Sequence, residues 1–241
     1  MYWDPSLKYY NKLRKCPYVS FPLYNEKKIA RYGDKEYIKK LHKIFGNIFF
    51  NYFFAHVRSL FGIVQFVRGW ETRNIRSNHL KVGQFAYNYF LPNDDIIEEV
   101  NTYFDEVKNK ADVIVGLHIR KGDYKTWLNG SYYFEDYIYE SLMSQVEEIF
   151  PQKKVIFFVA TNGEISDLIT RKHSIFRIKS GTAAHDLFGL SKCDYIIGPP
   201  STFSKWAALV GKVPLHHVYD KNEKLSVDSF SYSVALSDWV I

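Results

Sequence analysis

A short polar stretch near the middle of the chain carries the side chains best suited to hold an anionic ligand. The stretch VIVGLHIRKGDY, residues 113–124, is an apolar run that ends in His118, Arg120 and Asp123. A guanidinium group can hold two phosphate oxygens at once, and it stays charged at any working pH. The alternative is that Arg120 and Asp123 form an ion pair on a surface loop. The spacing alone leaves both interpretations open.

A second stretch, YIIGPPSTFS at residues 195–204, ends in hydroxyl side chains. Ser201 and Thr202 stand where a helix is expected to begin. A helix N-terminus presents free N–H groups and the positive end of the helix dipole, which attract anions. Ordinary N-capping is the alternative, and the same hydroxyls can do both. A cationic strand end and a hydroxyl-rich helix start in one sheet together indicate a diphosphate between them.

Alternating strands and helices are expected to position both stretches. The run 113–117 is typical of a buried strand in a parallel sheet, and such sheets bind ligands beyond the carboxyl ends of their strands. The sequence PNDD at 92–95 predicts the start of a helix. Further strands are expected at 155–160, 175–178, 195–198 and 213–218, with helices at 134–150, 164–172, 185–192 and 202–210. This alternation predicts an α/β fold with a parallel sheet and helices on both faces.

The chain is expected to have two parts, with a boundary near residue 92. Residues 1–92 are rich in aromatic side chains, and helical spacing of apolar residues predicts a mainly helical region there. Residues 93–241 contain the alternating elements and form the predicted Rossmann-like domain. Both candidate stretches therefore belong to the C-terminal part.

The charge and the cysteine content of the chain indicate which kinds of binding partner and which cellular compartment to expect. The net charge of +6 favours an anionic partner, but the chain has no compact Lys/Arg run of the kind that follows a nucleic-acid backbone, so we expect no nucleic-acid partner. Cys16 and Cys193 are too few for a four-ligand metal site and favour a reduced, cytoplasmic protein. The apolar window 48–67 contains Arg58 among other polar residues, so it predicts a core or peripheral helix. Peripheral association with the inner face of the membrane is the alternative location.

Three motifs along the chain resemble those of the bacterial α-1,2-fucosyltransferases and, more distantly, the α-1,6- and protein O-fucosyltransferases. The motif HIRKGDY at 118–124 is similar to the family's H-x-R-R-x-D box, and HDLFGLSKCD at 185–194 and STFSKWAA at 201–208 are similar to its two later boxes. The motifs occur in the family's order, and the resemblance extends from about Ala111 onward. It implies that the Rossmann-like domain is the donor-binding half of a GT-B-type glycosyltransferase.

The resemblance also implies an activity and roles for individual residues. It implies an inverting, metal-independent enzyme without a cofactor that transfers L-fucose from GDP-fucose to a galactose-type hydroxyl of a glycan acceptor in α-1,2 linkage. Arg120, Ser201 and Thr202 would bind the diphosphate, and Arg120 would stabilise the charge that grows on the leaving oxygen. His118 would lie near the nucleoside. Asp186 would accept hydrogen bonds from guanine, with a first-turn helix acid as the alternative.

The remaining acidic and titratable candidates have more than one interpretation. Asp123 is a candidate general base for the acceptor hydroxyl, but a role in orienting Arg120 or capping the loop is favoured. His185 is a further titratable candidate, for which plain surface exposure is favoured. The chain has no D-x-D motif, and Asp94 and Asp95 are explained by helix capping, so no metal site is expected.

Two features depart from the family pattern. Lys121 stands where the family often has a second arginine, so the charge is kept but the bidentate geometry is lost. The glycine-rich G-G-L-G-N-Q-type segment that opens the family's first half does not occur in this sequence, so we expect an N-terminal half that is truncated or reduced. Alternative functions are therefore a non-catalytic GDP-sugar-binding protein, or a GDP-sugar transferase with another acceptor.

Overall fold

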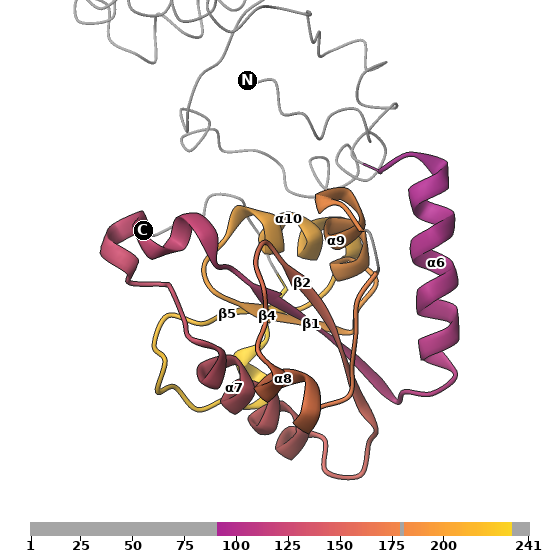
Figure 1. The fold of residues 1–241 in the computed structure, drawn as a ribbon. Coiled ribbons are helices and arrows are strands. Elements are labelled where there is room, and N and C mark those ends of the chain that lie inside the picture. Colours follow the sequence, from indigo (N-terminus) through magenta and orange to yellow (C-terminus); the bar gives the residue numbers. More distant parts are fainter. Residues whose placement is uncertain (1–90, 179–180, 233–241) are drawn as a thin grey trace, which may run out of the picture. The chain divides into compact units, whose positions relative to one another are not determined.

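A five-stranded parallel sheet lies at the centre of the computed structural model, which describes residues 91–178 and 181–232 (Figure 1). The strands are β1 (Val113–Ile119), β2 (Val155–Thr161), β3 (Ile175–Phe176), β4 (Tyr195–Gly198) and β5 (Leu215–His217). Their order across the sheet is β3-β2-β1-β4-β5, and each neighbouring pair is parallel. The order of connection therefore reverses between β1 and β4, which is the position where open α/β sheets bind ligands.

Helices cover both faces of the sheet (Figure 1). The described helices are α6 (Asp94–Lys108), α7 (Asp136–Ile149), α8 (Asp167–Lys172), α9 (Ala183–Leu190) and α10 (Thr202–Gly211), with short 3₁₀ helices η3 (Gly122–Lys125), η4 (Trp127–Gly130) and η5 (Val227–Ser229). Figure 1 shows α7 and α8 together on one face and α9 and α10 on the other, and α6 packs against α9. The layering is the one that the alternating sequence pattern predicts.

Strand β1 is buried along its whole length, so it forms the centre of the core. It hydrogen-bonds to β2 on one side and β4 on the other, with Ile119 opposite Thr161 and Leu117 opposite Ile197. Gly198 allows β4 to approach closely, because a Cβ atom there would lie 2.4 Å from the carbonyl oxygen of His118. The carboxyl ends of β1 and β4 are thereby held against each other.

The structure confirms the predicted strands and helices of the C-terminal part and shifts several of their ends. Strand β5 is shorter than the predicted 213–218, and α9 begins two residues before the predicted 185. The earlier start has a local cause: Thr182 is the N-cap, and its backbone N–H donates to Nδ1 of His185 at 3.0 Å. A histidine in this role is outside the usual capping signature, in which Glu or Gln occupies the third position.

The connection from β1 to α7 contains η3 and η4, which the sequence pattern does not predict. Leu128 and Asn129 have φ angles of 48° and 57°, so two consecutive non-glycine residues adopt the left-handed conformation. Gly122 and Gly130, with φ angles of 39° and 76°, also lie in this region. Alternating hydrophobicity carries no signal for such a turn, and only Gly122 and Gly130 mark it in the sequence.

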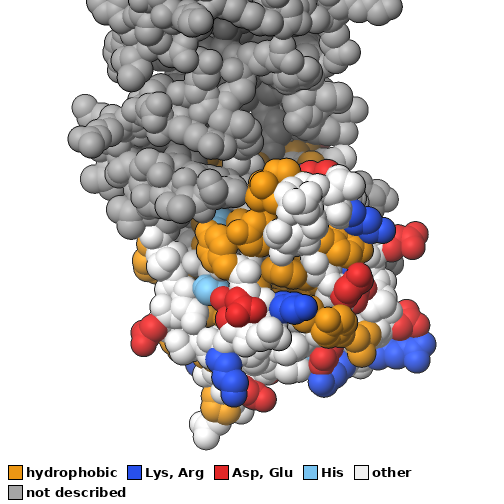
Figure 2. All heavy atoms as spheres, turned by 90° about the vertical axis from the view of Figure 1, so that its left-hand side faces the viewer, with side chains coloured by type: hydrophobic (Ala, Val, Ile, Leu, Met, Phe, Trp, Pro, Cys, Tyr) orange, Lys and Arg blue, Asp and Glu red, His pale blue; other side chains and the backbone are white. Residues whose placement is uncertain are grey.

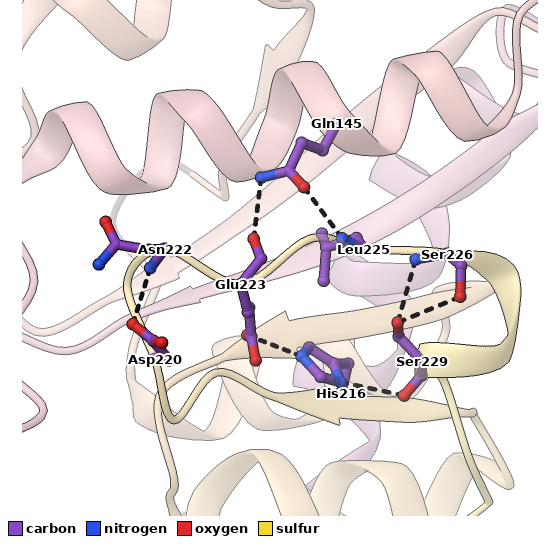
Figure 3. A network of polar contacts seen from close by, with 8 residues as sticks. All are labelled: Gln145, His216, Asp220, Asn222, Glu223, Leu225, Ser226 and Ser229. Carbon is purple, nitrogen blue, oxygen red and sulfur yellow. Dashed lines mark hydrogen bonds and ion pairs between the residues drawn. The ribbon is translucent and has the colours of Figure 1, made fainter.

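A polar network fastens the segment after β5 to the rest of the domain (Figure 3). Gln145 of α7 accepts a hydrogen bond from the backbone N–H of Leu225 at 2.9 Å. His216 contacts Glu223 Oε1 at 2.8 Å through Nε2 and the carbonyl oxygen of Ser229 at 3.0 Å through Nδ1. His216 of β5 therefore has a structural role: it holds the segment after β5 in place.

Neither sign of charge predominates on the surface shown in Figure 2, where acidic and basic side chains lie close to one another among apolar ones. In the described ranges no helix is long and apolar enough to cross a bilayer. The prediction of a mainly helical, aromatic-rich region at 1–92, the window 48–67 and Cys16 fall outside the described residues, apart from residues 91 and 92. Cys193 is buried and unbridged.

Candidate functional site

The candidate site lies at the carboxyl ends of β1 and β4, where the strand order reverses. Arg120 follows the last residue of β1, and Ser201 precedes the first residue of α10. A parallel sheet brings the carboxyl ends of its strands to one edge, so residues far apart in sequence meet there. The predicted placement of Arg120, Ser201 and Thr202 at one edge of one sheet is confirmed.

Arg120 is held by three contacts on different sides. Its Nη2 lies 3.2 Å from Asp123 Oδ2, and its guanidinium carbon lies 5.4 Å from the centre of the Tyr124 ring. Its backbone N–H donates to the hydroxyl of Tyr139 at 3.3 Å. Nε of Arg120 has no hydrogen-bond partner in the described structure. With 29% of the side chain exposed, the guanidinium group is oriented yet still open to a ligand.

Tyr124 connects the two halves of the site. Its hydroxyl donates to the carbonyl oxygen of Pro200 at 2.6 Å, and its ring carries the Arg120 guanidinium group on the other side. Burial raises the pKa of Tyr124, against a lowering effect of its hydrogen bond with Ser201. A single aromatic ring thus lies between Arg120 and the start of α10. Sequence reasoning missed this residue, although it directly follows the charged motif.

The first turn of α10 is capped by its own side chains. Ser201 is buried, and its Oγ accepts a hydrogen bond from the backbone N–H of Phe203 at 3.2 Å. The capping interpretation of Ser201 is therefore correct, whatever else its hydroxyl does. Thr202 is exposed at the first helical position. Its backbone N–H and hydroxyl stand at the positive end of the helix dipole.

His118 is a buried, uncharged imidazole beside this turn. It is 3% exposed, and its ring stacks on the half-buried ring of Phe203 with 5.3 Å between centroids and 30° between planes. Burial lowers the pKa of His118 to about 3, and the nearby charges of Arg120 and His217 lower it further. Its Nδ1 lacks a hydrogen-bond partner within the described residues. A buried polar atom without a hydrogen bond costs free energy of folding, so the unpaired Nδ1 of His118 needs a physical reason.

Asp186 lies in the first turn of α9, against the carboxyl end of β2. Burial raises the pKa of Asp186 to about 6, although Arg177 and a hydrogen bond from the backbone of Thr161 oppose the rise. Thr161 pairs with Ile119, the residue before Arg120. Asp186 is therefore a first-turn acid, as the alternative interpretation predicts, and it belongs to the same edge of the sheet as Arg120.

Lys121 does not extend the cationic surface of the site. Its Nζ donates to the carbonyl oxygen of Phe134 at 2.9 Å and lies 2.5 Å from Oδ1 of Asp136. Its side chain also lies over the ring of Tyr133. Lys121 keeps the positive charge at this position, but its ammonium group is engaged by Asp136 and by the carbonyl oxygen of Phe134.

His185 also differs from its expected placement. It is 7% exposed, not a surface residue, because its Nδ1 caps α9 while its Nε2 lies 3.2 Å from Oε2 of Glu99 on α6. Asp94 and Asp95 stand in the first turn of α6, where acidic side chains complement the helix dipole, and the N-cap position itself is Asn93. Across the described ranges, no three metal-ligating side chains are grouped closely enough to hold a metal ion.

Comparisons with known proteins found similar solved structures. Similar solved structures include POFUT1 in complex with GDP, with 17% identity, 56% of this chain and 49% of that chain covered and a TM-score of 0.39. They also include the fucosyltransferase NodZ from Bradyrhizobium, with 19% identity, 52% and 44% coverage and a TM-score of 0.36.

This chain spans about half the length of those structures. No curated protein matches it. The sequence model of glycosyl transferase family 11 matches residues 39–240, which include every candidate residue described above. The chain therefore belongs to glycosyl transferase family 11.

Proposed function

We propose that the protein is a fucosyltransferase that binds GDP-fucose at the carboxyl ends of β1 and β4 and transfers L-fucose to a galactose-type hydroxyl of a glycan, in α-1,2 linkage. The observation that carries the proposal is the placement of Arg120 on one side of the Tyr124 ring while the hydroxyl of that ring contacts Pro200, directly before the first turn of α10. Family membership supports the same donor and reaction class.

The diphosphate of the donor is assigned to Arg120 and the start of α10. Nε of Arg120 is buried and unpaired, while the side chain as a whole is 29% exposed, so the guanidinium group can offer N–H groups to phosphate oxygens. Thr202 contributes an exposed hydroxyl and the N-terminal amides of a ten-residue helix. Ser201 contributes chiefly by shaping this turn, since its hydroxyl already accepts from Phe203. A cation and a helix dipole would then act on the same phosphates.

The nucleoside is assigned to His118 and Asp186. A carboxylate suits guanine because the N1–H and N2–H₂ groups of the base are adjacent donors, a pair that adenine lacks. The pKa of Asp186 is raised to about 6 by burial, so the group is ionised at pH 7.5 and can accept both hydrogen bonds. His118 is neutral at this pH, and its unpaired Nδ1 is available for one hydrogen bond with the nucleoside.

The transfer follows as an inverting displacement at the anomeric carbon of fucose. The acceptor hydroxyl oxygen forms a bond to this carbon and gives up its proton, for which Asp123 is the candidate acceptor, while the bond from the carbon to the β-phosphate oxygen breaks and GDP leaves. Negative charge grows on the departing phosphate, where Arg120 and the N–H groups of α10 bind it more strongly than in the ground state. This charge stabilisation needs no metal ion, so we propose a metal-independent enzyme without a cofactor.

Asp123 is assigned to the orientation of Arg120. Its carboxylate contacts Nη2 of Arg120, and Nδ2 of Asn162 donates to its other oxygen at 3.4 Å. The same group, 59% exposed, is also the candidate base that takes the proton from the acceptor hydroxyl. The pH dependence of turnover distinguishes the two roles, because the rate of turnover follows the protonation state of the general base.

A GDP-sugar-binding protein without transferase activity is the second candidate function. Every residue assigned above lies on the donor side, so tight binding of GDP without turnover fits this alternative. A transferase for another GDP-sugar or acceptor would share the donor site.

The test combines binding with turnover. Calorimetric titration should give binding of GDP and much weaker binding of ADP. Incubation with GDP-fucose and lactose or N-acetyllactosamine should release GDP and yield a fucosylated product, unchanged by added EDTA. Binding without product under all acceptors would support the second candidate, and absence of GDP binding would overturn both. Loss of turnover in EDTA would contradict the metal-independent mechanism.

A further inference from the structure

A second histidine, His217, stands at the carboxyl end of β5 beside the same turn of α10. Its Nε2 lies 3.0 Å from Oγ of Ser204, and that hydroxyl in turn donates to the carbonyl oxygen of Ser201 at 3.2 Å. Ser204 is fully buried. The two contacts connect the strand β5 to the residue that begins α10, through one hydroxyl group.

The direction of these hydrogen bonds follows from the chemistry of the three groups. The carbonyl oxygen of Ser201 can only accept, so the one proton of the Ser204 hydroxyl is directed to it. The hydroxyl must then accept from His217, which assigns the proton of the neutral imidazole to Nε2. Burial lowers the pKa of His217 to about 4, with Lys205 and His216 adding to the effect, so the neutral form prevails at pH 7.5.

Three residues around this turn are held by contacts from β1, from the loop after β1 and from β5. Phe203 stacks on His118 at the end of β1, Ser204 accepts from His217 at the end of β5, and Pro200 accepts from Tyr124 in the loop after β1. The backbone N–H of Lys205 also donates to Ser201 at 3.2 Å, so that carbonyl accepts two hydrogen bonds. A turn fixed in this way keeps its amides in one direction before any ligand arrives.

We propose that His217 is a positioning residue for the diphosphate site, acting through Ser204 on the Ser201–Thr202 turn. The proposal rests on the proposed function, since it presumes that this turn receives the diphosphate. His217 does not touch the donor in this scheme. Instead, His217 fixes the direction of the N–H groups at the start of α10 that meet the phosphate oxygens. A site that is already ordered binds its ligand more tightly than one that must become ordered on binding.

The experiment measures GDP affinity of the full chain by calorimetry, together with the melting temperature of each variant. His217→Leu and Ser204→Ala each remove the hydrogen bond from one side and should weaken GDP binding about tenfold. His217→Gln should recover most of the affinity, because its amide NH₂ can donate to Ser204 in place of Nε2. The double variant His217→Leu/Ser204→Ala should be no weaker than either single variant, since both lose the same contact.

His216→Gln is the matched control, because it changes the neighbouring histidine on the same strand. His216 contacts Glu223 and Ser229 in the network of Figure 3, so this variant should lower the melting temperature and leave GDP affinity unchanged. If His217→Leu and Ser204→Ala bind GDP like the wild type, or if His216→Gln weakens binding equally, the positioning role is wrong. If the wild type itself binds no GDP, the proposed function fails and the positioning role fails with it. Should His217→Leu not fold, Ser204→Ala decides the question alone.

Discussion

Two consecutive cations in one motif have opposite environments. Arg120 pairs with Asp123, which is 59% exposed, and keeps an unpaired Nε at the edge of the sheet. Lys121 pairs with Asp136, where the two side chains are only 11% and 17% exposed, and lies over aromatic rings. The comparison teaches that adjacent like charges need not serve one ligand: one is available for binding, and the other holds the β1–α7 connection to the domain.

Removing the buried cation should have the largest effect on stability. Lys121→Met should lower the free energy of unfolding by about 3 kcal/mol, because the partly buried carboxylate of Asp136 loses its charged partner and keeps the hydrogen bond from the backbone of Ser166. Chemical denaturation measures the loss. Burial works to raise the pKa of Asp136, but hydrogen bonds from Lys121 and Ser166 outweigh it and lower the pKa, so the carboxylate is charged at neutral pH. Recovery of part of the stability in Lys121→Met/Asp136→Asn would confirm the ion pair. A Lys121→Met variant as stable as the wild type would show that Lys121 does not stabilise the fold.

Removing the open cation should act on turnover instead. Arg120→Ala should reduce turnover by about a hundredfold or more, as loss of a group that stabilises transition-state charge does. Its stability should change by about 1 kcal/mol or less, since the pair with Asp123 is exposed. Arg120→Lys is the matched control and should recover only part of the activity, because it restores the charge without the bidentate geometry. Near-normal turnover of Arg120→Ala would remove this residue from the mechanism.

A partly buried acidic residue, Asp186, extends the comparison. Asp186→Asn should weaken GDP binding about 10–100-fold by loss of charge-assisted hydrogen bonds. The wild type should prefer GDP over inosine diphosphate, which lacks the N2 amino group, and the variant should show a smaller preference. In the wild type, GDP affinity should fall as the pH drops through about 6, where Asp186 takes up a proton, while the pKa values of about 3 and 4 leave His118 and His217 neutral. Affinity that is equal at pH 5 and pH 7.5 would argue against a guanine contact by this carboxylate.

The same substitution should stabilise the fold. The pKa of Asp186 is raised in the folded state, so the neutral form is favoured there, and this contribution is lost as the pH rises through about 6. Asp186→Asn should therefore raise the free energy of unfolding by about 1–3 kcal/mol at pH 7.5 and change it little at pH 4. Higher stability together with weaker GDP binding would show that Asp186 serves ligand binding. A loss of both stability and GDP affinity would show that its role is structural.

The smallest effect is expected for the partner of the open cation. Asp123→Asn should lower turnover about threefold to tenfold while leaving the shape of the pH profile unchanged, because Asn can still accept from Arg120 but without its charge. The steady-state rate measured between pH 5 and pH 9 checks this. A loss of more than about a hundredfold, with disappearance of the acidic limb of the profile, would instead make Asp123 the general base.

The sequence allowed a good prediction of the sheet and of the end of it at which the candidate residues lie. Continuous apolar runs such as the one ending at Ile119 are typical of buried strands in an α/β fold, and the parallel topology then places Arg120 and Ser201 at the same end of the sheet. What the pattern could not supply was the direction of individual side chains. Lys121 and Arg120 have the same charge in the sequence, and only tertiary contacts with Asp136 and Phe134 distinguish them.

The contacts that were missed all join residues distant in sequence. Tyr124 meets Pro200 and His217 meets Ser204, and in neither pair does local spacing reveal the partner. The sequence alone favours plain surface exposure for His185, but the structure buries it. Its capping of α9 and its contact with Glu99 depend on the packing of α6 against α9, which no single segment encodes.

The gathering of all candidate groups at the carboxyl ends of the strands leaves the opposite edge of the sheet available for attachment. The loop before β2 is exposed there, including Gln152. A reporter dye or a surface anchor fixed at that position would face away from the proposed donor site, so nucleotide exchange could be followed on an immobilised protein without masking its entrance.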